Sequence, residues 1–180
     1  STDTLILVRA FADNCVHSLI AFLSWFSLKF CKTQQFSLQK LTFIECLCCA
    51  AIASFIDFDH FLAARSFHLK RVLNLSSRPP FHCSTLFLLI STILVVVGSK
   101  MKLILLTVAG FMLFVASSTH HLRDGLRRGL WLYPFANTPP LNPILYFASL
   151  FSIPIVSYFL LNFFETFINR NESTIKYEIV

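Results

Sequence analysis

Long apolar runs, separated by short polar connections, dominate this sequence. The run from Leu41 to Ile56, for example, contains a single charged residue, Glu45. Of all residues, 56% are hydrophobic and only 13% are charged, against about 25% charged residues in a typical soluble domain. A helix needs about 20 apolar residues to cross the hydrocarbon core of a bilayer. The sequence therefore predicts an all-α protein that crosses a membrane several times.

About five transmembrane helices are predicted, and they form one helical bundle over residues 1–168. Helices are expected because a spanning segment must satisfy its own backbone hydrogen bonds inside the bilayer. Proline clusters before residues 82 and 143 mark two of the helix starts. The predicted spans are residues 14–30, 41–60, 82–98, 101–121 and 143–165. Residues 169–180 are predicted to form a polar C-terminal tail.

The formal charge of +6 comes from Lys and Arg residues that mostly lie in the connections between apolar runs. Basic residues usually flank membrane helices in this way, so we expect the lipid bilayer as a partner and no nucleic acid. Basic residues are almost equally numerous on the two predicted sides of the membrane. The charge distribution therefore does not predict the orientation.

The histidines and aspartates gather on one predicted side of the membrane. Successive connections alternate sides, so the N-terminal segment and the connections 61–81 and 121–142 share a side. All His and all Asp residues lie on or near that side. On four helices, an Asp or His lies about 24–27 Å from the opposite face at about 1.5 Å of rise per residue. We therefore predict one shared polar site near one membrane surface.

Spacing within the helices points to metal-binding chemistry. Three pairs of carboxylate and imidazole are three or four residues apart and share a helix face: Asp13 with His17, Asp57 with His60, and His120 with Asp124. Such groups ligate zinc, manganese or iron, and a metal ion would offset the cost of burying a carboxylate. The predicted ligands are Asp57, His60, His82, His120 and Asp124.

A metal ion surrounded by arginines is suited to hydrolysis. Arg78 and Arg127 lie close to the predicted site, and guanidinium groups bind phosphate bidentately. A metal-activated water would attack a phosphoester or a similar lipid-like substrate. We predict that Arg78 and Arg127 bind the developing oxyanion. His17 or Asp59 is predicted to act as a general base or as a further ligand.

The same residues also have plain structural interpretations. His17 can be a hydrogen-bonded core histidine, and the acids can form ordinary ion pairs. The alternative partners are Arg65 or Arg78 for Asp57 and Asp59, Arg127 or Arg128 for Asp124, and Lys40 for Glu45. Three functions therefore stay open: a metal-dependent hydrolase, a non-catalytic protein in which the cluster is structural, and a transporter that uses the acids as a relay.

Four motifs carry a resemblance to a known family. They are DNCVH, SFIDFDHFLAARS, RPPFHCST and HHLRDGLRRGLWLYPF. In combination they resemble the eukaryotic transmembrane protein 267 family, and the resemblance covers nearly the whole chain. That family has an additional N-terminal hydrophobic segment, so the resemblance implies a chain that is truncated or divergent at its start.

A more distant similarity is to bacterial inner-membrane proteins described as membrane-bound metal-dependent hydrolases, the YdjM-like group. Their pattern combines an N-terminal His, Asp-x-Asp-His, His-Arg-x-x-Thr-His-Ser and Ser-His-x-x-x-Asp. The matching residues here are His17, Asp57, Asp59, His60, Arg78, His82, His120 and Asp124. The similarity implies metal ligands among them. Ser77 stands where the bacterial pattern has its first His, so one ligand or general acid of that pattern is missing.

Overall fold

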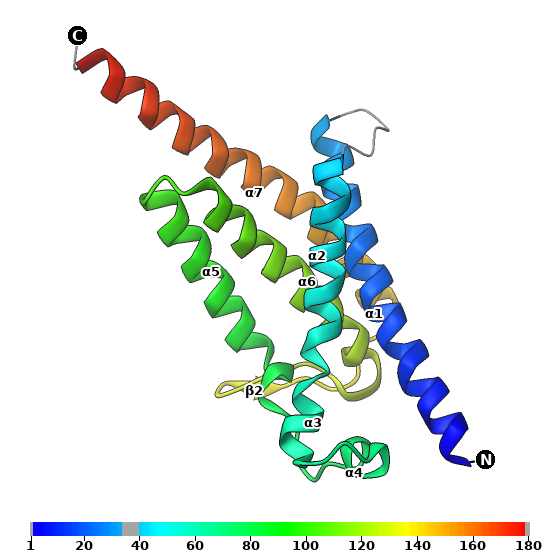
Figure 1. The fold of residues 1–180 in the computed structure, drawn as a ribbon. Coiled ribbons are helices and arrows are strands. Elements are labelled where there is room, and N and C mark those ends of the chain that lie inside the picture. Colours follow the sequence, from blue (N-terminus) through cyan, green and yellow to red (C-terminus); the bar gives the residue numbers. More distant parts are fainter. Residues whose placement is uncertain (1, 34–39, 179–180) are drawn as a thin grey trace.

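The structure is a computed structural model that describes residues 2–33 and 40–178. Helices make up nearly all of it (Figure 1). The longer helices are α1 (Thr2–Thr33), α2 (Lys40–Ile56), α5 (Ser84–Lys100), α6 (Ile104–Arg128) and α7 (Pro143–Glu178). The short elements are α3 (Asp59–Ala64), α4 (Leu69–Leu73), the 3-10 helix η1 (Pro80–His82), and the strands β1 (Trp131–Leu132) and β2 (Ala136–Asn137).

Four helical segments are long and apolar enough to cross a membrane. They are Thr4–Lys32, Lys40–Ala64, Ile104–Arg128 and Pro143–Asn169. The predicted span 82–98 corresponds to α5, an apolar helix of 17 residues, which is at the short end of the range that crosses a bilayer. The structure thus confirms the prediction of an all-α, multi-pass integral membrane protein.

Several helix boundaries differ from the predicted ones. α1 begins at Thr2 rather than near residue 14, so Asp13 lies inside the helix, where two arginines of α6 pair with its carboxylate. α7 continues to Glu178, into the segment predicted as a tail. The predicted span 41–60 is interrupted at Asp57 and Phe58, which form a turn between α2 and α3.

α6 is the central helix of the bundle, and α1, α2, α5 and α7 all contact it. α5 approaches it most closely, because Gly110 lets the two backbones meet. A Cβ atom at Gly110 would lie 2.8 Å from Val95 Cγ2 and 2.9 Å from Val95 N. The elements α3, α4 and β2 gather at one end of this bundle (Figure 1). The predicted polar site lies at the same end.

At the other end of the bundle, ion pairs connect α1 to its neighbours. Glu45 of α2 accepts a hydrogen bond from Trp25 Nε1 at 3.1 Å and pairs with Lys29 Nζ at 2.8 Å. Lys32 pairs with Glu165 of α7. Lys29 and Trp25, rather than the predicted Lys40, are thus the partners that hold Glu45. This half-buried carboxylate is tolerated there because it is paired.

Candidate metal centre

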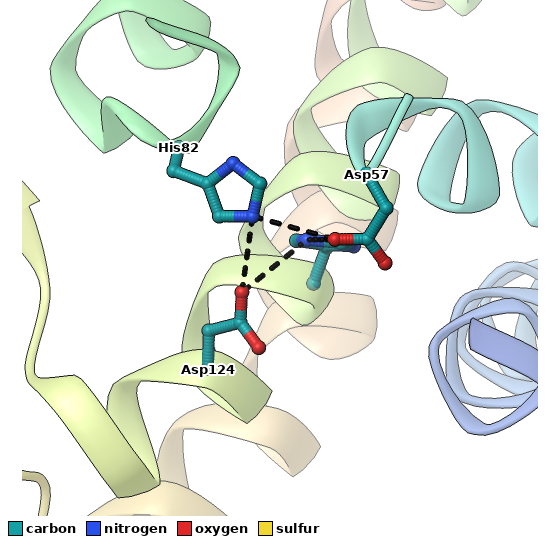
Figure 2. A group of neighbouring side chains, drawn as sticks. Asp57, His82 and Asp124 are labelled. Atoms are coloured by element: carbon teal, nitrogen blue, oxygen red, sulfur yellow. Dashed lines mark ion pairs between the residues drawn. The ribbon is translucent and has the colours of Figure 1, made fainter. Parts of the chain in front are cut away.

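The central cluster of the site consists of Asp57, His82, His120 and Asp124. Asp57 lies in the turn after α2, His82 ends η1, and His120 and Asp124 lie one turn apart on α6. Each offers one ligand atom, and these atoms all lie within 4.8 Å of one another. Figure 2 shows Asp57, His82 and Asp124 pointing toward one another from their separate segments.

Nitrogen and oxygen atoms alternate around the centre of this cluster. His82 Nε2 lies 3.4 Å from Asp57 Oδ1 and 3.3 Å from Asp124 Oδ2. His120 Nε2 lies 3.6 Å and 3.5 Å from the same two oxygens. Charge-assisted hydrogen bonds are shorter, at about 2.7–2.9 Å. Both Nε2 atoms are buried and make no hydrogen bond to any residue that the structure describes.

These distances test whether the residues fit a metal ion. In a tetrahedral site with metal–ligand distances of about 2.0–2.2 Å, neighbouring ligand atoms lie about 3.3–3.6 Å apart. The four measured distances, from 3.3 to 3.6 Å, agree with that spacing. Two buried imidazole nitrogens that lack hydrogen-bond partners are also better suited to binding a cation between them than to contacting each other. The residues of the central cluster can therefore hold a divalent metal ion.

Asp59 lies behind His82 rather than at the centre of the cluster. Its Oδ1 atom lies 3.4 Å from His82 Nδ1, the ring nitrogen opposite Nε2, and 3.2 Å from His60 Nδ1. Its Oδ2 atom accepts the Phe81 N–H at 2.6 Å. A carboxylate in this position fixes the orientation of a metal-binding imidazole. Asp59 and His60 thus belong to a layer that supports His82.

His121 has a role that the sequence did not predict. Its side chain is buried, and its Nε2 atom donates a hydrogen bond to the Phe81 carbonyl at 2.9 Å. Asp59 accepts the N–H of Phe81 and His121 binds its carbonyl, so the two side chains together hold both backbone polar groups of the residue before His82. The only sequence signal was its position next to His120, which by helix geometry directs the two imidazoles to different faces.

His17 lies beside the cluster from α1. Its ring stacks on His120 with centroids 3.9 Å apart, and its Nε2 atom lies 3.5 Å from Asp124 Oδ1. Asp13, one turn earlier, accepts hydrogen bonds from Arg123 at 2.8 Å and from Arg127 at 3.0 and 2.8 Å. Arg127 therefore pairs with Asp13, and Asp124 faces the three imidazoles.

Arg78 supports the loop after α6 instead of facing the cluster. Its guanidinium group donates to the carbonyls of Gly129, at 3.1 Å, and Arg128. Gly129 has φ +70°, and a Cβ atom there would lie 1.9 Å from the Thr138 carbonyl oxygen. Only glycine fits this turn. The structure thus brings Asp57, His82, His120 and Asp124 together, with His17, Asp59 and His60 around them, whereas Arg78 and Arg127 have other partners.

The electrostatic environment of His82 favours a cation. Burial disfavours the charged imidazolium, but the carboxylates of Asp124, Asp57 and Asp59 outweigh that cost and raise the pKa of His82 to about 11. The carboxylates therefore create a negative potential at the cluster.

A cavity of about 320 Å³ opens beside the cluster. Asp57 and Asp124 of the central cluster line it, together with His17 and His60. Apolar residues of α1 and α4 line it as well, namely Leu7, Phe11, Val72 and Leu73. The central cluster is thus accessible from one side, although His120 itself is fully buried.

Comparison with known proteins identifies the relatives of this chain. Transmembrane protein 267 of Danio rerio is 38% identical over 149 residues, which cover 82% of this chain and 64% of the relative. The Mus musculus protein of the same name is 36% identical over 160 residues, covering 86% and 69%. The Bos taurus protein is 36% identical over 163 residues, covering 88% and 72%. The chain belongs to the transmembrane protein 267 family.

Family membership agrees with the membrane-spanning helices, since the relatives are named as transmembrane proteins. The chain spans about two thirds of the length of the transmembrane protein 267 relatives it matches, from 64% to 72%. No protein-family model matches the chain. No solved structure matches it.

Proposed function

We propose that the central cluster binds a divalent metal ion and that the protein is a metal-dependent hydrolase acting on a phosphoester or lipid-like substrate. One observation carries the metal proposal. The four distances between the Nε2 atoms of His82 and His120 and the oxygens of Asp57 and Asp124 match four of the six edges of a tetrahedral site. Zinc suits this geometry and this mixture of nitrogen and oxygen donors, and manganese and iron accept the same donors.

The cavity supports hydrolysis as the use of this metal site. It places space for a substrate directly beside Asp57 and Asp124. A divalent metal ion supplies water activation and polarisation of a phosphoryl oxygen. The similarity of the Asp57–His60, His82 and His120–Asp124 motifs to the bacterial metal-dependent hydrolases points to the same chemistry.

The residues around the cavity have distinct roles in this proposal. His17 lines the cavity, and its Nε2 atom lies 3.5 Å from Asp124 Oδ1, so we assign this imidazole as proton acceptor. Water adds to phosphorus, the bond to the leaving oxygen breaks, and the proton from the water passes to that oxygen. We assign Arg127 to the phosphoryl oxygens, for which it would exchange its present partner Asp13; Asp59 orients His82, and Arg78 holds the loop after α6.

A structural metal site is the second candidate, and one observation favours it. The cluster contains four protein ligands, and closed sites of four ligands are typical of structural zinc. Such a site would tie together α2, η1 and α6. In this case the metal ion stabilises the bundle, and the cavity has no catalytic role.

Hydrolysis assays on purified protein separate the two candidates. The protein is stripped of metal, reloaded with zinc, manganese or iron, and assayed with p-nitrophenyl phosphate and bis(p-nitrophenyl) phosphate. A hydrolase releases p-nitrophenol only after reloading, and Asp57→Asn abolishes the release, whereas Glu45→Gln at the other end of the bundle preserves it. Tight metal binding without turnover of either substrate contradicts the hydrolase and supports the structural site.

A further inference from the structure

We infer that the cavity beside the central cluster binds a membrane lipid whose headgroup is a phosphate, an inference that rests on the metal-dependent function proposed above. The volume of about 320 Å³ is within the range of small-molecule sites, about 300–1,000 Å³. The lining has two chemically distinct parts. One is charged and includes Asp57 and Asp124 of the central cluster, and the other is apolar and comes mainly from α1 and α4.

The charged part favours an anion once a divalent ion is bound. Three carboxylates and two guanidinium groups line the cavity, so its lining carries one net negative charge with neutral histidines. A divalent cation reverses this to one net positive charge. The charged residues are Asp13, Asp57, Asp124, Arg127 and Arg128. Binding of an anion in this cavity therefore depends on the metal ion.

Arg127 already binds an oxyanion in the geometry that a phosphate requires. Its Nη1 atom lies 3.0 Å from Asp13 Oδ2, and its Nη2 atom lies 2.8 Å from Asp13 Oδ1. These two parallel hydrogen bonds form the fork by which guanidinium groups bind carboxylates and phosphates alike. Arg128 is exposed and lines the same cavity. Asp13 occupies the fork of Arg127, so the exposed Arg128 is the guanidinium group that we assign to the phosphate.

The apolar part of the lining points to a lipid phosphate rather than a free phosphate ion. Leu7 and Phe11 of α1 are 53% and 70% exposed, and Val72 and Leu73 of α4 complete this wall. A free phosphate has no contact to make with such a wall. An acyl chain leaving the headgroup would cover it, and Leu7 and Phe11 lie in Thr4–Lys32, a helical segment long and apolar enough to cross a membrane.

Calorimetric titration of the zinc-loaded chain in a non-ionic detergent tests this inference. The probes are soluble dioctanoyl phosphatidic acid, inorganic phosphate and dioctanoylglycerol. We expect phosphatidic acid to bind more tightly than the other two and to lose affinity when zinc is removed. Arg128→Gln should weaken phosphatidic acid and phosphate about ten-fold. Arg9→Gln, the same change on an exposed residue outside the cavity lining, should change neither.

A matched pair of leucine substitutions on α1 tests separately whether the acyl chain contacts the apolar lining. Leu7 and Leu5 are almost equally exposed, at 53% and 51%, but only Leu7 lines the cavity. Leu7→Asn should weaken phosphatidic acid while leaving inorganic phosphate unchanged, because it removes an apolar contact without changing the charge of the lining, and Leu5→Asn should affect neither. If Leu7→Asn binds phosphatidic acid as the wild type does, the ligand is not a lipid and the inference is overturned.

The zinc content of every sample separates this inference from the proposal on which it rests. A protein that binds zinc but not phosphatidic acid overturns the lipid inference and leaves the metal centre intact. A protein that binds no zinc after reloading overturns the metal-dependent function itself. Equal affinity for phosphatidic acid and dioctanoylglycerol shows that the phosphate is not recognised, which also overturns the inference.

Discussion

The substitution Asp59→Asn tests how the metal centre is built around His82. Asp59 Oδ1 faces His82 Nδ1 at 3.4 Å, and Oδ2 accepts the Phe81 N–H at 2.6 Å. Asparagine keeps an acceptor for Phe81 but loses the negative charge behind the imidazole. Substitution of such a supporting carboxylate typically lowers metal affinity about 10–100-fold, which corresponds to about 1.4–2.8 kcal/mol.

The assay is competition for zinc between the purified protein and a chromophoric chelator. Glu45→Gln is the matched control, because it removes a paired carboxylate at the opposite end of the bundle. We expect Asp59→Asn to weaken zinc binding and Glu45→Gln to leave it unchanged, with similar thermal midpoints for both apo-proteins. Wild-type zinc affinity in Asp59→Asn, or an equal loss in Glu45→Gln, would refute the role of Asp59 in orienting His82.

Two further predictions concern stability. Gly110→Leu should lower the free energy of unfolding by about 1–3 kcal/mol or more, because even a Cβ atom would lie 2.8 Å from Val95 Cγ2. Ala109→Leu, on the exposed face of the same helix, should cost much less. Thermal denaturation in detergent measures both variants, and equal midpoints would contradict the close packing of α5 on α6. Zinc at one hundred times its dissociation constant should stabilise the protein by about 2.7 kcal/mol and raise its midpoint. His120→Ala should abolish that rise, and an undiminished rise would place the zinc elsewhere.

The membrane fold could be predicted because the length of an apolar run reflects the thickness of the bilayer rather than tertiary contacts. The same topology placed Asp57, His82, His120 and Asp124 in one layer, since alternating connections and the helical rise determine depth. Helix ends were less predictable. α1 starts at Thr2, and the pairing of its Asp13 with Arg123 and Arg127 of α6 joins residues 110 and 114 positions apart in sequence.

The roles of individual side chains depended on local breaks and long-range contacts. The spacing of Asp57 and His60 assumed a continuous helix, but the turn at Asp57 ends α2, and His60 Nδ1 lies closer to Asp59, at 3.2 Å, than to Asp57, at 3.9 Å. Arg78 was expected near an oxyanion, but its guanidinium group meets carbonyls about 50 residues further along the chain. No periodic pattern in the sequence encodes such a contact.

X-ray absorption at the zinc edge of the zinc-loaded protein tests the central claim most directly. The account predicts a first shell of about four nitrogen and oxygen atoms at about 2.0–2.2 Å, with the outer-ring scattering of two imidazoles, and its loss in the Asp57→Ala, His82→Ala double variant. Sulfur scatterers at about 2.3 Å, or the absence of stoichiometric zinc in well-folded protein, would contradict a metal centre formed by Asp57, His82, His120 and Asp124.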